Sequence, residues 1–327
     1  MHAAAAPAPT APATAPVDAA CTLVQRLQGG LGNQLFQIAF ARKLARASGA
    51  ALAYDIDSFG HDAYGRVPLL HRLLPDAPVL RVATLPPATT RLLPESAFPL
   101  PARGPMPARF ALPAGLTHLV LDGYWQDHRV VDADDAALLS AALAAQLPAS
   151  AAPIAERVRT ARCPVSLHVR RHDYKHHGLC AEAYYLDTLA WLQRRHGALD
   201  LFVFSDEPNY TRHLLRSAGW TGQLVHSGSD VGDLHLMALC RHHVISNSSY
   251  SWWGALLSGS DDVVCPAPWS FIGHVSPQLC PPHWRRVQGA VEQLVSTQRF
   301  TDQLEQHDPG RGDAPSPEEA PWTNACA

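Results

Sequence analysis

The most restrictive feature of this sequence is the alternation, along most of its length, of short apolar runs with segments of helical periodicity. Residues 201–204 are such an apolar run, residues 164–169 predict another strand, and residues 181–195 between them repeat apolar side chains at helical spacing. Continuous apolar runs of this length are typical of parallel strands buried on both faces. Strands that alternate with helices form parallel sheets with right-handed crossovers, so the pattern predicts an α/β protein.

The first alternating unit lies near the amino terminus. Residues 22–27 predict a strand, Gly29-Gly30-Leu31-Gly32 a turn, and the residues up to Gly49 a helix, after which residues 51–54 resume as a strand. A helix between two strands of this kind makes a βαβ unit. Its two strands are therefore expected to be parallel neighbours in one sheet.

A longer series of elements follows. The expected strands are at residues 116–123, 164–169, 201–204, 223–226, 243–246 and 262–265, the last of them ending before Pro266, and the expected helices are at residues 133–147, 155–161, 181–195, 209–218, 233–240 and 249–257. The proline-rich residues 73–114 predict irregular loops with one or two short helices. Two successive α/β sheets imply two Rossmann-like domains that face a ligand-binding cleft.

The length of 327 residues suits this two-domain organisation. The first twenty residues are rich in Ala and Pro and lack the basic start and apolar block of a secretory signal. The expected divisions are a disordered leader at residues 1–20, an amino-terminal α/β domain at 21–158, a carboxyl-terminal α/β domain at 159–300, and a flexible tail at 301–327.

Composition excludes several classes of function. The 26 Lys and Arg are scattered among 29 Asp and Glu, so no nucleic-acid partner is expected. No apolar stretch reaches the roughly 18 to 20 residues of a membrane-spanning helix, so no integral membrane segment is expected. Seven cysteines without a Cys-x-x-Cys pair indicate free thiols in a reducing compartment. We expect a cytoplasmic protein, with peripheral association at the inner face of the membrane left open.

The glycine turn after the first strand invites a dinucleotide-binding interpretation, with Asp55 and Asp57 at the distance of a ribose-binding acid. Leu35 opposes it, because that position needs a small residue for close packing of helix on strand. The turn still brings backbone N–H groups and the amides of Asn33 and Gln34 to a helix start, which suits a polar or anionic ligand. The alternative is a tight turn in which Asn33 caps the helix.

Two arginines, Arg170 and Arg171, directly follow the expected strand at 164–169. Guanidinium groups at the carboxyl edge of a parallel sheet match phosphate oxygens and predict a phosphate clamp. The alternative is a surface ion pair between one arginine and Asp173. Histidines at positions 168, 172, 176 and 177 suggest metal ligands by their spacing, but a strand and the loop after it do not share a helical face, and no metal site is expected here.

Two further strand ends carry polar residues. Residues 246–251 form a turn rich in Ser and Asn before a helix, which predicts a second anion-binding helix start; the alternative is ordinary N-capping, with Trp252 and Trp253 as core residues. Asp206 and Glu207 follow the strand at 201–204, and their carboxylates can accept the paired N–H donors of a guanine edge. Their alternative role is capping of the next helix.

Together these segments resemble the α-1,2-fucosyltransferases of glycosyltransferase family 11, from about Leu27 to Trp269. The resemblance rests on five motifs in order, which are Gly29-Gly30-Leu31-Gly32-Asn33-Gln34-Leu35-Phe36-Gln37, Gly123-Tyr124-Trp125-Gln126, His168-Val169-Arg170-Arg171-His172-Asp173-Tyr174, Phe204-Ser205-Asp206-Glu207 and Asn247-Ser248-Ser249-Tyr250-Ser251-Trp252-Trp253-Gly254. The sequence departs from the family pattern at three places. The family usually has Gly at 172, Asp at 207 and Thr-Phe at 249–250.

The resemblance implies a GT-B-like architecture and inverting transfer of L-fucose from GDP-β-L-fucose to the 2-hydroxyl of a terminal galactose. The acceptor would be a galactose-terminated oligosaccharide or a lipid-linked glycan, as in O-antigen or oligosaccharide biosynthesis. It also implies no cofactor and no required divalent metal. Two Asp-x-Asp triplets, Asp55-Ile56-Asp57 and Asp132-Ala133-Asp134, lie in the amino-terminal half and are interpreted as a strand end and a helix start.

The same resemblance assigns the site residues. The donor-binding set is His168, Arg170, Arg171, Asp206, Glu207, Asn247, Ser248, Ser249, Tyr250 and Ser251. The acceptor-side set is Gly30, Gly32, Asn33, Gln34, Tyr124, Trp125 and Gln126. The expected catalytic residues are Arg170, Asp173 and Asn33. Tyr124 and Trp125 offer flat faces to a sugar, or serve as packing between the domains.

Several alternatives stay open. Asp173 is either the general base or the partner of Arg171, and if the leaving group departs early, Asn33, Gln34 or Gln126 suffices to orient the acceptor. Which of Asp206 and Glu207 binds guanine is also open. The competing functions are a related transferase with another GDP-sugar or linkage, and a non-catalytic nucleotide-sugar-binding protein. The sequence does not specify the acceptor glycan, the oligomeric state or the source organism.

Overall fold

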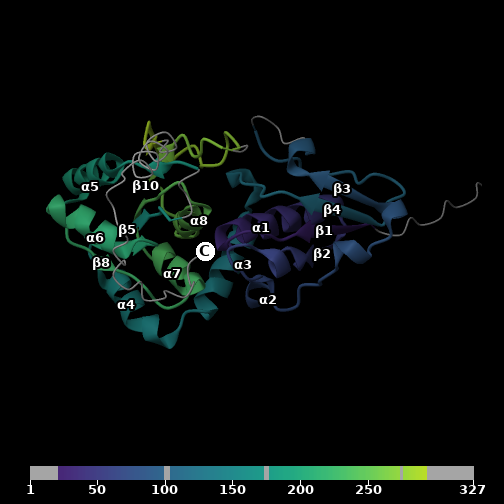
Figure 1. The fold of residues 1–327 in the computed structure, drawn as a ribbon, viewed down its shortest axis with the longest axis horizontal. Helices are drawn as coiled ribbons and strands as arrows, with labels where there is room; N and C mark the ends of the chain where they lie inside the picture. The colour runs from purple at the N-terminus through teal and green to yellow at the C-terminus, as the bar shows by residue number, and fades with distance from the viewer. Residues whose placement is uncertain (1–20, 99–103, 173–176, 273–274, 293–327) are drawn as a thin grey trace, which may run out of the picture.

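The computed structural model describes residues 21–98, 104–172, 177–272 and 275–292, and in these residues the strands form two parallel sheets surrounded by helices (Figure 1). The predicted α/β class, with two Rossmann-like sheets in a GT-B-like arrangement, is confirmed. The leader at 1–20 and the tail at 301–327 lie outside the described residues. The six cysteines among the described residues are buried free thiols, as predicted.

The amino-terminal sheet has the order β2-β1-β4-β3, and all its strands are parallel. Its strands are β1 (Thr22–Arg26), β2 (Ala51–Asp55), β3 (Thr90–Pro94) and β4 (His118–Asp122). Helix α1 (Leu31–Ser48) joins β1 to β2 and ends at Gly49, whose φ of 70° is the left-handed conformation of a glycine C-cap. Strand β3 lies in the segment expected to be loops. As the edge strand it tolerates Pro94 at its end.

The carboxyl-terminal sheet has the order β11-β10-β9-β5-β7-β8, again parallel throughout. Its strands are β5 (Pro164–Val169), β7 (Asp200–Ser205), β8 (Gln223–Leu224), β9 (His242–Val244), β10 (Val263–Ala267) and β11 (Arg285–Gln288). A separate antiparallel pair joins β6 (Leu179–Cys180) to β12 (Val291–Glu292).

The prediction of a last strand ending before Pro266 is wrong, because β10 continues to Ala267 and β11 and β12 follow it. The register gives the reason. Strand β10 pairs with β9 only at Val263 and Val264, so at Pro266 it pairs with β11 alone. A proline at a position with only one strand neighbour removes no ladder hydrogen bond on its open side.

Helices cover both sheets. They are α2 (Leu70–Leu73), α3 (Ala133–Ala145), α4 (Ala152–Thr160), α5 (Glu182–His196), α6 (Pro208–Ser217), α7 (Asp230–Ala238) and α8 (Ser249–Leu257). Short 3₁₀ turns occur at residues 57–61, 82–84, 87–89, 95–97, 128–130 and 149–151. The two Asp-x-Asp triplets lie at the end of β2 and the start of α3, as interpreted from the sequence.

The two halves of the molecule meet through helices, since α1 and α3 contact α7 and α8 between the sheets (Figure 1). The ring of Phe36 on α1 lies 4.3 Å from the ring of Trp252 and 5.1 Å from that of Trp253, both on α8. Both tryptophans are fully buried. One hydrophobic cluster therefore extends from the amino-terminal sheet across α1 to α8, and the predicted core role of the two tryptophans is confirmed.

Within the described residues, no single helix combines the length and apolarity needed to cross a membrane. Only residues 133–145 and 149–160 taken together meet those criteria of length and composition, and the two helical segments are bent by 98° relative to each other.

Candidate active site

Three neighbouring strands of the carboxyl-terminal sheet, β9, β5 and β7, end at the same edge, because they are parallel and adjacent. Arg170 and Arg171 follow β5, Asp206 and Glu207 follow β7, and the turn at 246–248 follows β9. Loops after the carboxyl ends of parallel strands are where α/β proteins bind ligands. The structure therefore brings together the donor-side segments that the sequence separates by up to about eighty residues.

The starts of helices α1 and α8 meet at this edge. A Cβ added to Gly32 would lie 2.5 Å from the carbonyl carbon of Ser249, so only glycine allows this approach. Ser249 Oγ donates a hydrogen bond of 2.8 Å to Asn33 Oδ1, and Gln126 Nε2 donates one of 2.8 Å to the same oxygen. Each helix start carries a partial positive charge, so two of them at one place favour an anionic ligand.

Asn33 does not cap α1, so the alternative considered for it is wrong. The N-cap position is Gly30, without a side-chain hydrogen bond, and Asn33 lies inside the first turn with its carbonyl oxygen bound by Gln126 and Ser249. The hydrogen bonds of the Gln34 amide are made within the protein. It is buried, donates to the carbonyl oxygen of Val67 at 3.1 Å and accepts from Leu69 N at 2.8 Å, so it fixes the following loop.

The serines at the start of α8 mostly build the turn itself. Ser248 Oγ accepts a hydrogen bond from Tyr250 N at 3.3 Å as the N-cap, as one alternative predicted. Ser251 is fully buried, and its Oγ donates to the carbonyl oxygen of Ser248. Asn247 is buried and donates to the carbonyl oxygen of Gly178 at 2.9 Å. The expectation that the Asn247 and Ser251 side chains face the donor therefore needs correction, since burial places both inside the protein.

Arg170 and Asp206 form a mostly buried ion pair, with Nε 3.2 Å from Oδ2. Asp206 also accepts hydrogen bonds of 3.0 Å from the backbone N–H groups of Arg171 and His172. Burial raises the pKa of the Asp206 carboxyl, against the opposing effects of the Arg170 charge and the two N–H donors. Asp206 thus orients Arg170 and holds the loop after β5 in place.

The next pair, Arg171 and Glu207, is more exposed. Arg171 Nε lies 3.0 Å from Glu207 Oε2, and the guanidinium carbon lies 3.8 Å from the centre of the Tyr210 ring. Glu207 occupies the N-cap position of α6 but makes no capping hydrogen bond through its side chain, so the capping alternative is not seen. Asp173, the partner expected for Arg171 from the sequence, lies outside the described residues.

His168 is buried beneath the arginines, with Nδ1 2.9 Å from Ser246 Oγ. Burial, and secondarily the Arg170 charge, lowers the pKa of His168 to about 3. Its ring lies 5.7 Å from the ring of Tyr250, whose hydroxyl donates to the carbonyl oxygen of Asp230 at 2.6 Å. A neutral imidazole in this position supports the floor of the site. Of the four histidines at 168, 172, 176 and 177 in the sequence analysis, His176 lies outside the described residues.

On the acceptor side, Trp125 is fully buried and stacks on Phe40 with 4.1 Å between ring centres, so it has no face to offer a sugar. Packing against Phe40 and Phe98 takes up the ring, and the expectation of a sugar contact there is corrected. Tyr124 is 41% exposed and its ring lies beside Gly29, where an added Cβ would be 3.3 Å from Cε1. The Tyr124 backbone N–H donates to Glu95 Oε2 at 2.8 Å.

Sequence reasoning missed the loop at 62–69, which Gln34 holds beside the glycine turn. Asp62 Oδ1 accepts hydrogen bonds from the backbone N–H groups of Tyr64 and Arg66, and the Arg66 guanidinium lies 4.3 Å from the centre of the exposed Tyr64 ring. The available signal was an Asp followed three residues later by Gly65, a turn pattern between a strand and an apolar run.

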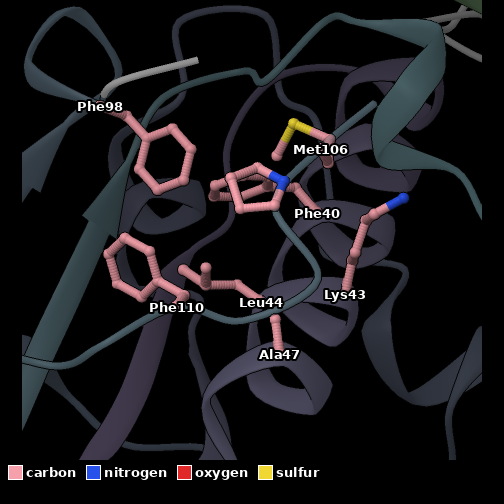
Figure 2. Close-up of a pocket in the computed structure, with 8 residues that line it drawn as sticks. Phe40, Lys43, Leu44, Ala47, Phe98, Met106 and Phe110 are labelled. Carbon is pink, nitrogen blue, oxygen red and sulfur yellow. The ribbon is translucent and has the colours of Figure 1, made fainter. Parts of the chain in front are cut away.

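A small apolar hollow elsewhere on α1 does not compete with this site (Figure 2). Figure 2 shows Phe40, Lys43, Leu44 and Phe98 around it, and its volume of about 10 Å³ holds at most one water molecule. Lys43 Nζ, its charged group, is already bound to Asp132 Oδ1 at 2.6 Å. The hollow is a feature of core packing.

Comparison with known proteins identifies relatives. The chain is 30% identical over 181 residues to an alpha-1,2-colitosyltransferase of Escherichia coli, covering 51% of this chain and 61% of that one. It is 33% identical over 132 residues to the O-antigen biosynthesis glycosyltransferase WbnK of Escherichia coli (36% and 43%), and 28% identical over 109 residues to galactoside alpha-(1,2)-fucosyltransferase 1 of Saimiri sciureus (30% and 30%). The matches thus span less than two thirds of each relative's length.

Among solved structures, the fucosyltransferase NodZ from Bradyrhizobium is similar with a TM-score of 0.46 at 16% identity, covering 73% of this chain and 93% of that one. POFUT1 in complex with GDP-fucose is similar with a TM-score of 0.44 at 12% identity, covering 85% and 99%. The model of the family described as "Glycosyl transferase family 11" matches residues 103–270, which is more than half of the chain. The chain therefore belongs to glycosyltransferase family 11.

Proposed function

We propose that this protein transfers L-fucose from GDP-β-L-fucose to the 2-hydroxyl of a terminal galactose, with inversion and without a required divalent metal. The observation that carries the proposal is the meeting of the starts of α1 and α8 at the sheet edge where Arg170 follows β5. Membership of family 11 and the α-1,2 linkage in the names of two relatives support the reaction class.

Arg170 is the proposed electrostatic catalyst. As the bond between fucose and the diphosphate breaks, negative charge grows on the leaving diphosphate. The guanidinium of Arg170, oriented by Asp206 at 3.2 Å, and the helix starts can stabilise that charge. These groups take the place that a metal ion fills in other transferases. Because they are held before the reaction begins, they need no reorganisation as the charge develops.

The acceptor hydroxyl attacks the anomeric carbon from the face opposite GDP. Asp173 stays the proposed general base, with pairing to Arg171 as its alternative role. If the leaving group departs early, orientation of the hydroxyl suffices, and the Gln126–Asn33–Ser249 hydrogen-bond chain is suited to that task. Tyr124 is 41% exposed, its ring lies beside Gly29 as does the Asn33 side chain, and it is our proposed platform for the galactose ring.

Glu207 is the better candidate of the two carboxylates for binding guanine. The oxygens of Asp206 already accept two backbone N–H groups and face Arg170, and the side chain is only 6% exposed. The Glu207 side chain is 32% exposed and is paired with Arg171 alone among the ion pairs of the described residues. A carboxylate with free acceptor capacity is what the N–H edge of guanine requires.

A second candidate is transfer of a different sugar, which the name of the Escherichia coli colitosyltransferase favours. A donor panel separates the two. The full chain is incubated with GDP-fucose or with the activated form of colitose, each with lactose, and released nucleotide and product linkage are measured by NMR, with and without a chelator.

The expected result is GDP release and an α-1,2-fucosylated product at the same rate in the presence of the chelator. A product with the activated form of colitose and none with GDP-fucose would favour the second candidate. Nucleotide binding without any turnover would contradict the enzyme assignment and favour a binding protein.

A further inference from the structure

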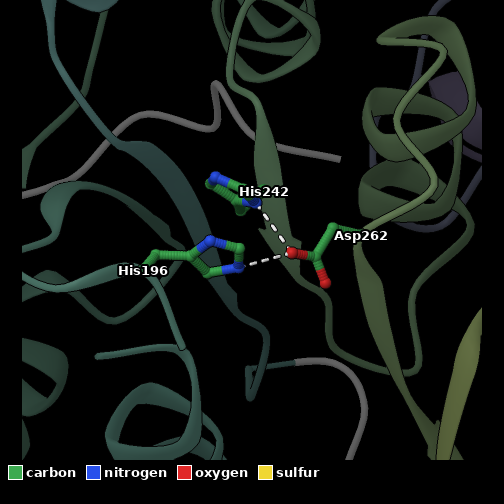
Figure 3. Close-up of side chains that lie close together, drawn as sticks. All are labelled: His196, His242 and Asp262. Atoms are coloured by element: carbon green, nitrogen blue, oxygen red, sulfur yellow. Dashed lines mark hydrogen bonds and ion pairs between the residues drawn. The ribbon is translucent and has the colours of Figure 1, made fainter. Parts of the chain in front are cut away.

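Three side chains lie together at the edge of the carboxyl-terminal sheet opposite the candidate active site. Figure 3 shows His196 and His242 directed at the same oxygen of Asp262. His196 Nε2 lies 2.7 Å and His242 Nδ1 2.9 Å from Asp262 Oδ2. Their potential ligand atoms all lie within 4.8 Å of one another. Two imidazoles and a carboxylate are a donor set that zinc uses in proteins.

The three groups come from different elements. His196 ends helix α5, His242 begins strand β9, and Asp262 precedes strand β10. The turn at 246–248, part of the candidate active site, follows the other end of β9. At a rise of about 3.3 Å per residue, four residues along the strand separate the two places by about 13 Å. The cluster is thus distinct from the proposed fucosyl-transfer site and needs no part of it.

Backbone contacts hold two of the three groups in place. The carbonyl oxygen of Asp262 accepts from His243 N at 3.1 Å, and the Asp262 backbone N–H donates to Ser260 Oγ at 3.0 Å. Ser260 Oγ in turn donates to the carbonyl oxygen of Arg241 at 2.6 Å. Asp262 is therefore fastened to the residues on both sides of His242. Such outer contacts are what keep metal ligands oriented.

The geometry is close to that of a three-ligand zinc site. With bonds of about 2.0–2.1 Å at tetrahedral angles, neighbouring ligand atoms lie about 3.3 Å apart. The two observed N···O distances are shorter by about 0.5 Å, which small rotations of the partly exposed His196 and Asp262 side chains can supply. The side chains of His196 and Asp262 are about a quarter exposed, so a fourth position can be taken by water.

We propose that His196, His242 and Asp262 bind one divalent transition-metal ion of the zinc class, with water as the fourth ligand. The ion joins the end of α5 to the starts of β9 and β10. Since the folded chain presents all three ligands together, binding stabilises the fold in proportion to the metal concentration. The ion lies at the edge of the sheet opposite the proposed fucosyl-transfer site, so fucosyl transfer does not depend on it.

The test is a calorimetric titration of the chelator-treated full chain with Zn²⁺, joined to the absorption spectrum with Co²⁺. The expected result is one ion per chain at micromolar affinity, the visible bands of four-coordinate cobalt, and a higher Tm with zinc. His196→Gln is the main variant, because His196 lies at a helix end rather than in the core. It is expected to weaken binding at least about tenfold and to abolish the cobalt bands and the Tm shift.

Asp262→Asn is also expected to weaken zinc binding. The matched control is His283→Gln, since His283 also pairs with an aspartate, Asp261, at 3.7 Å, but belongs to no three-ligand group among the described residues. It is expected to leave binding unchanged. Wild-type affinity in both His196→Gln and Asp262→Asn, or no saturable binding by the wild-type chain, would overturn the proposal and leave the cluster as a hydrogen-bonded His–Asp–His group.

Discussion

The two halves of the molecule meet at the candidate active site but contribute different things to it. The amino-terminal half supplies a glycine turn, where Gly32 lets the backbone of α1 approach that of Ser249. The carboxyl-terminal half supplies the paired charges, with Arg170 on Asp206 and Arg171 on Glu207. The amino-terminal half thus provides the close approach of two helix starts, and the carboxyl-terminal half provides the charged side chains. If this division is right, damage to each half should produce a different defect.

The largest effect is expected from Arg170→Ala, which removes the proposed charge from the carboxyl-terminal half. Loss of an electrostatic donor aimed at the transition state costs about 3–4 kcal/mol, so kcat should fall roughly 100- to 1000-fold. Steady-state kinetics with GDP-fucose and lactose measure this, with circular dichroism to establish folding. Arg195→Ala is the control, because Arg195 lies over the Trp191 ring on α5. Near-normal kcat in folded Arg170→Ala would remove this residue from the mechanism.

The next effect is expected from Gly32→Ala, which disturbs the close approach of α1 to α8 and leaves the charged side chains unchanged. The added Cβ would meet the backbone of Ser249 and Tyr250 at 2.5–2.6 Å, and backbone cannot rotate away. We expect a loss of about 1–3 kcal/mol in the free energy of unfolding and a loss of turnover as α1 moves from α8. Urea unfolding measures the first. Gly60→Ala is the matched control, since nothing lies within 4 Å of its added Cβ. Equal stability of the two variants would contradict the close approach.

A third prediction concerns pH and belongs to the carboxyl-terminal half. The pKa of His168 is lowered to about 3 in the folded chain. Above its unfolded pKa of about 6.5 both states are neutral, and as the pH falls below that value only the unfolded state takes a proton. Stability is therefore lost on acidification, by about 2 kcal/mol between pH about 7 and about 5 for this group.

The measurement for His168 is urea unfolding of the wild-type chain and of His168→Asn at the two pH values. The amide nitrogen or oxygen of Asn can keep a hydrogen bond to Ser246 Oγ without titrating. The variant should lose about 2 kcal/mol less than the wild type on acidification. Parallel pH profiles for the two chains would show that His168 is not held neutral.

The smallest effect is expected from Glu207→Gln, which separates the proposed role of Glu207 from that of Asp206 within the carboxyl-terminal half. If Glu207 binds guanine, the KM for GDP-fucose should rise about tenfold with little change in kcat, because one charge-assisted hydrogen bond is weakened. Asp206→Asn should instead lower kcat, since Asp206 orients Arg170. The opposite pattern, a raised KM in Asp206→Asn alone, would exchange the two roles.

Much of the fold could be predicted because strand and helix signals agree locally. The boundaries of β5 and α8 match the predicted ranges, and the end of α1 falls at Gly49 as its conformation requires. Strand β3 could not be predicted, because an edge strand that is only half-buried leaves no apolar run in the sequence. Strands β11 and β12 were missed because Pro266 suggests an end where the register leaves one side of β10 open.

The site was predictable as a set of segments but not as a set of side-chain roles. Parallel topology alone places Arg170 and Asp206 at one edge. Residue type does not tell which side chains face inward, so Trp125, Asn247 and Ser251 were expected at the ligand and are buried. The loop at 62–69 is fixed only by long-range hydrogen bonds to Gln34, which no local pattern reports.

A crystal structure of the full chain with GDP tests most directly whether the two helix starts and Arg170 together bind the diphosphate. The account predicts that the diphosphate lies at the meeting point of the starts of α1 and α8, with a β-phosphate oxygen within hydrogen-bond distance of the Arg170 guanidinium. A diphosphate bound away from both Arg170 and the turn at 246–248 would contradict it.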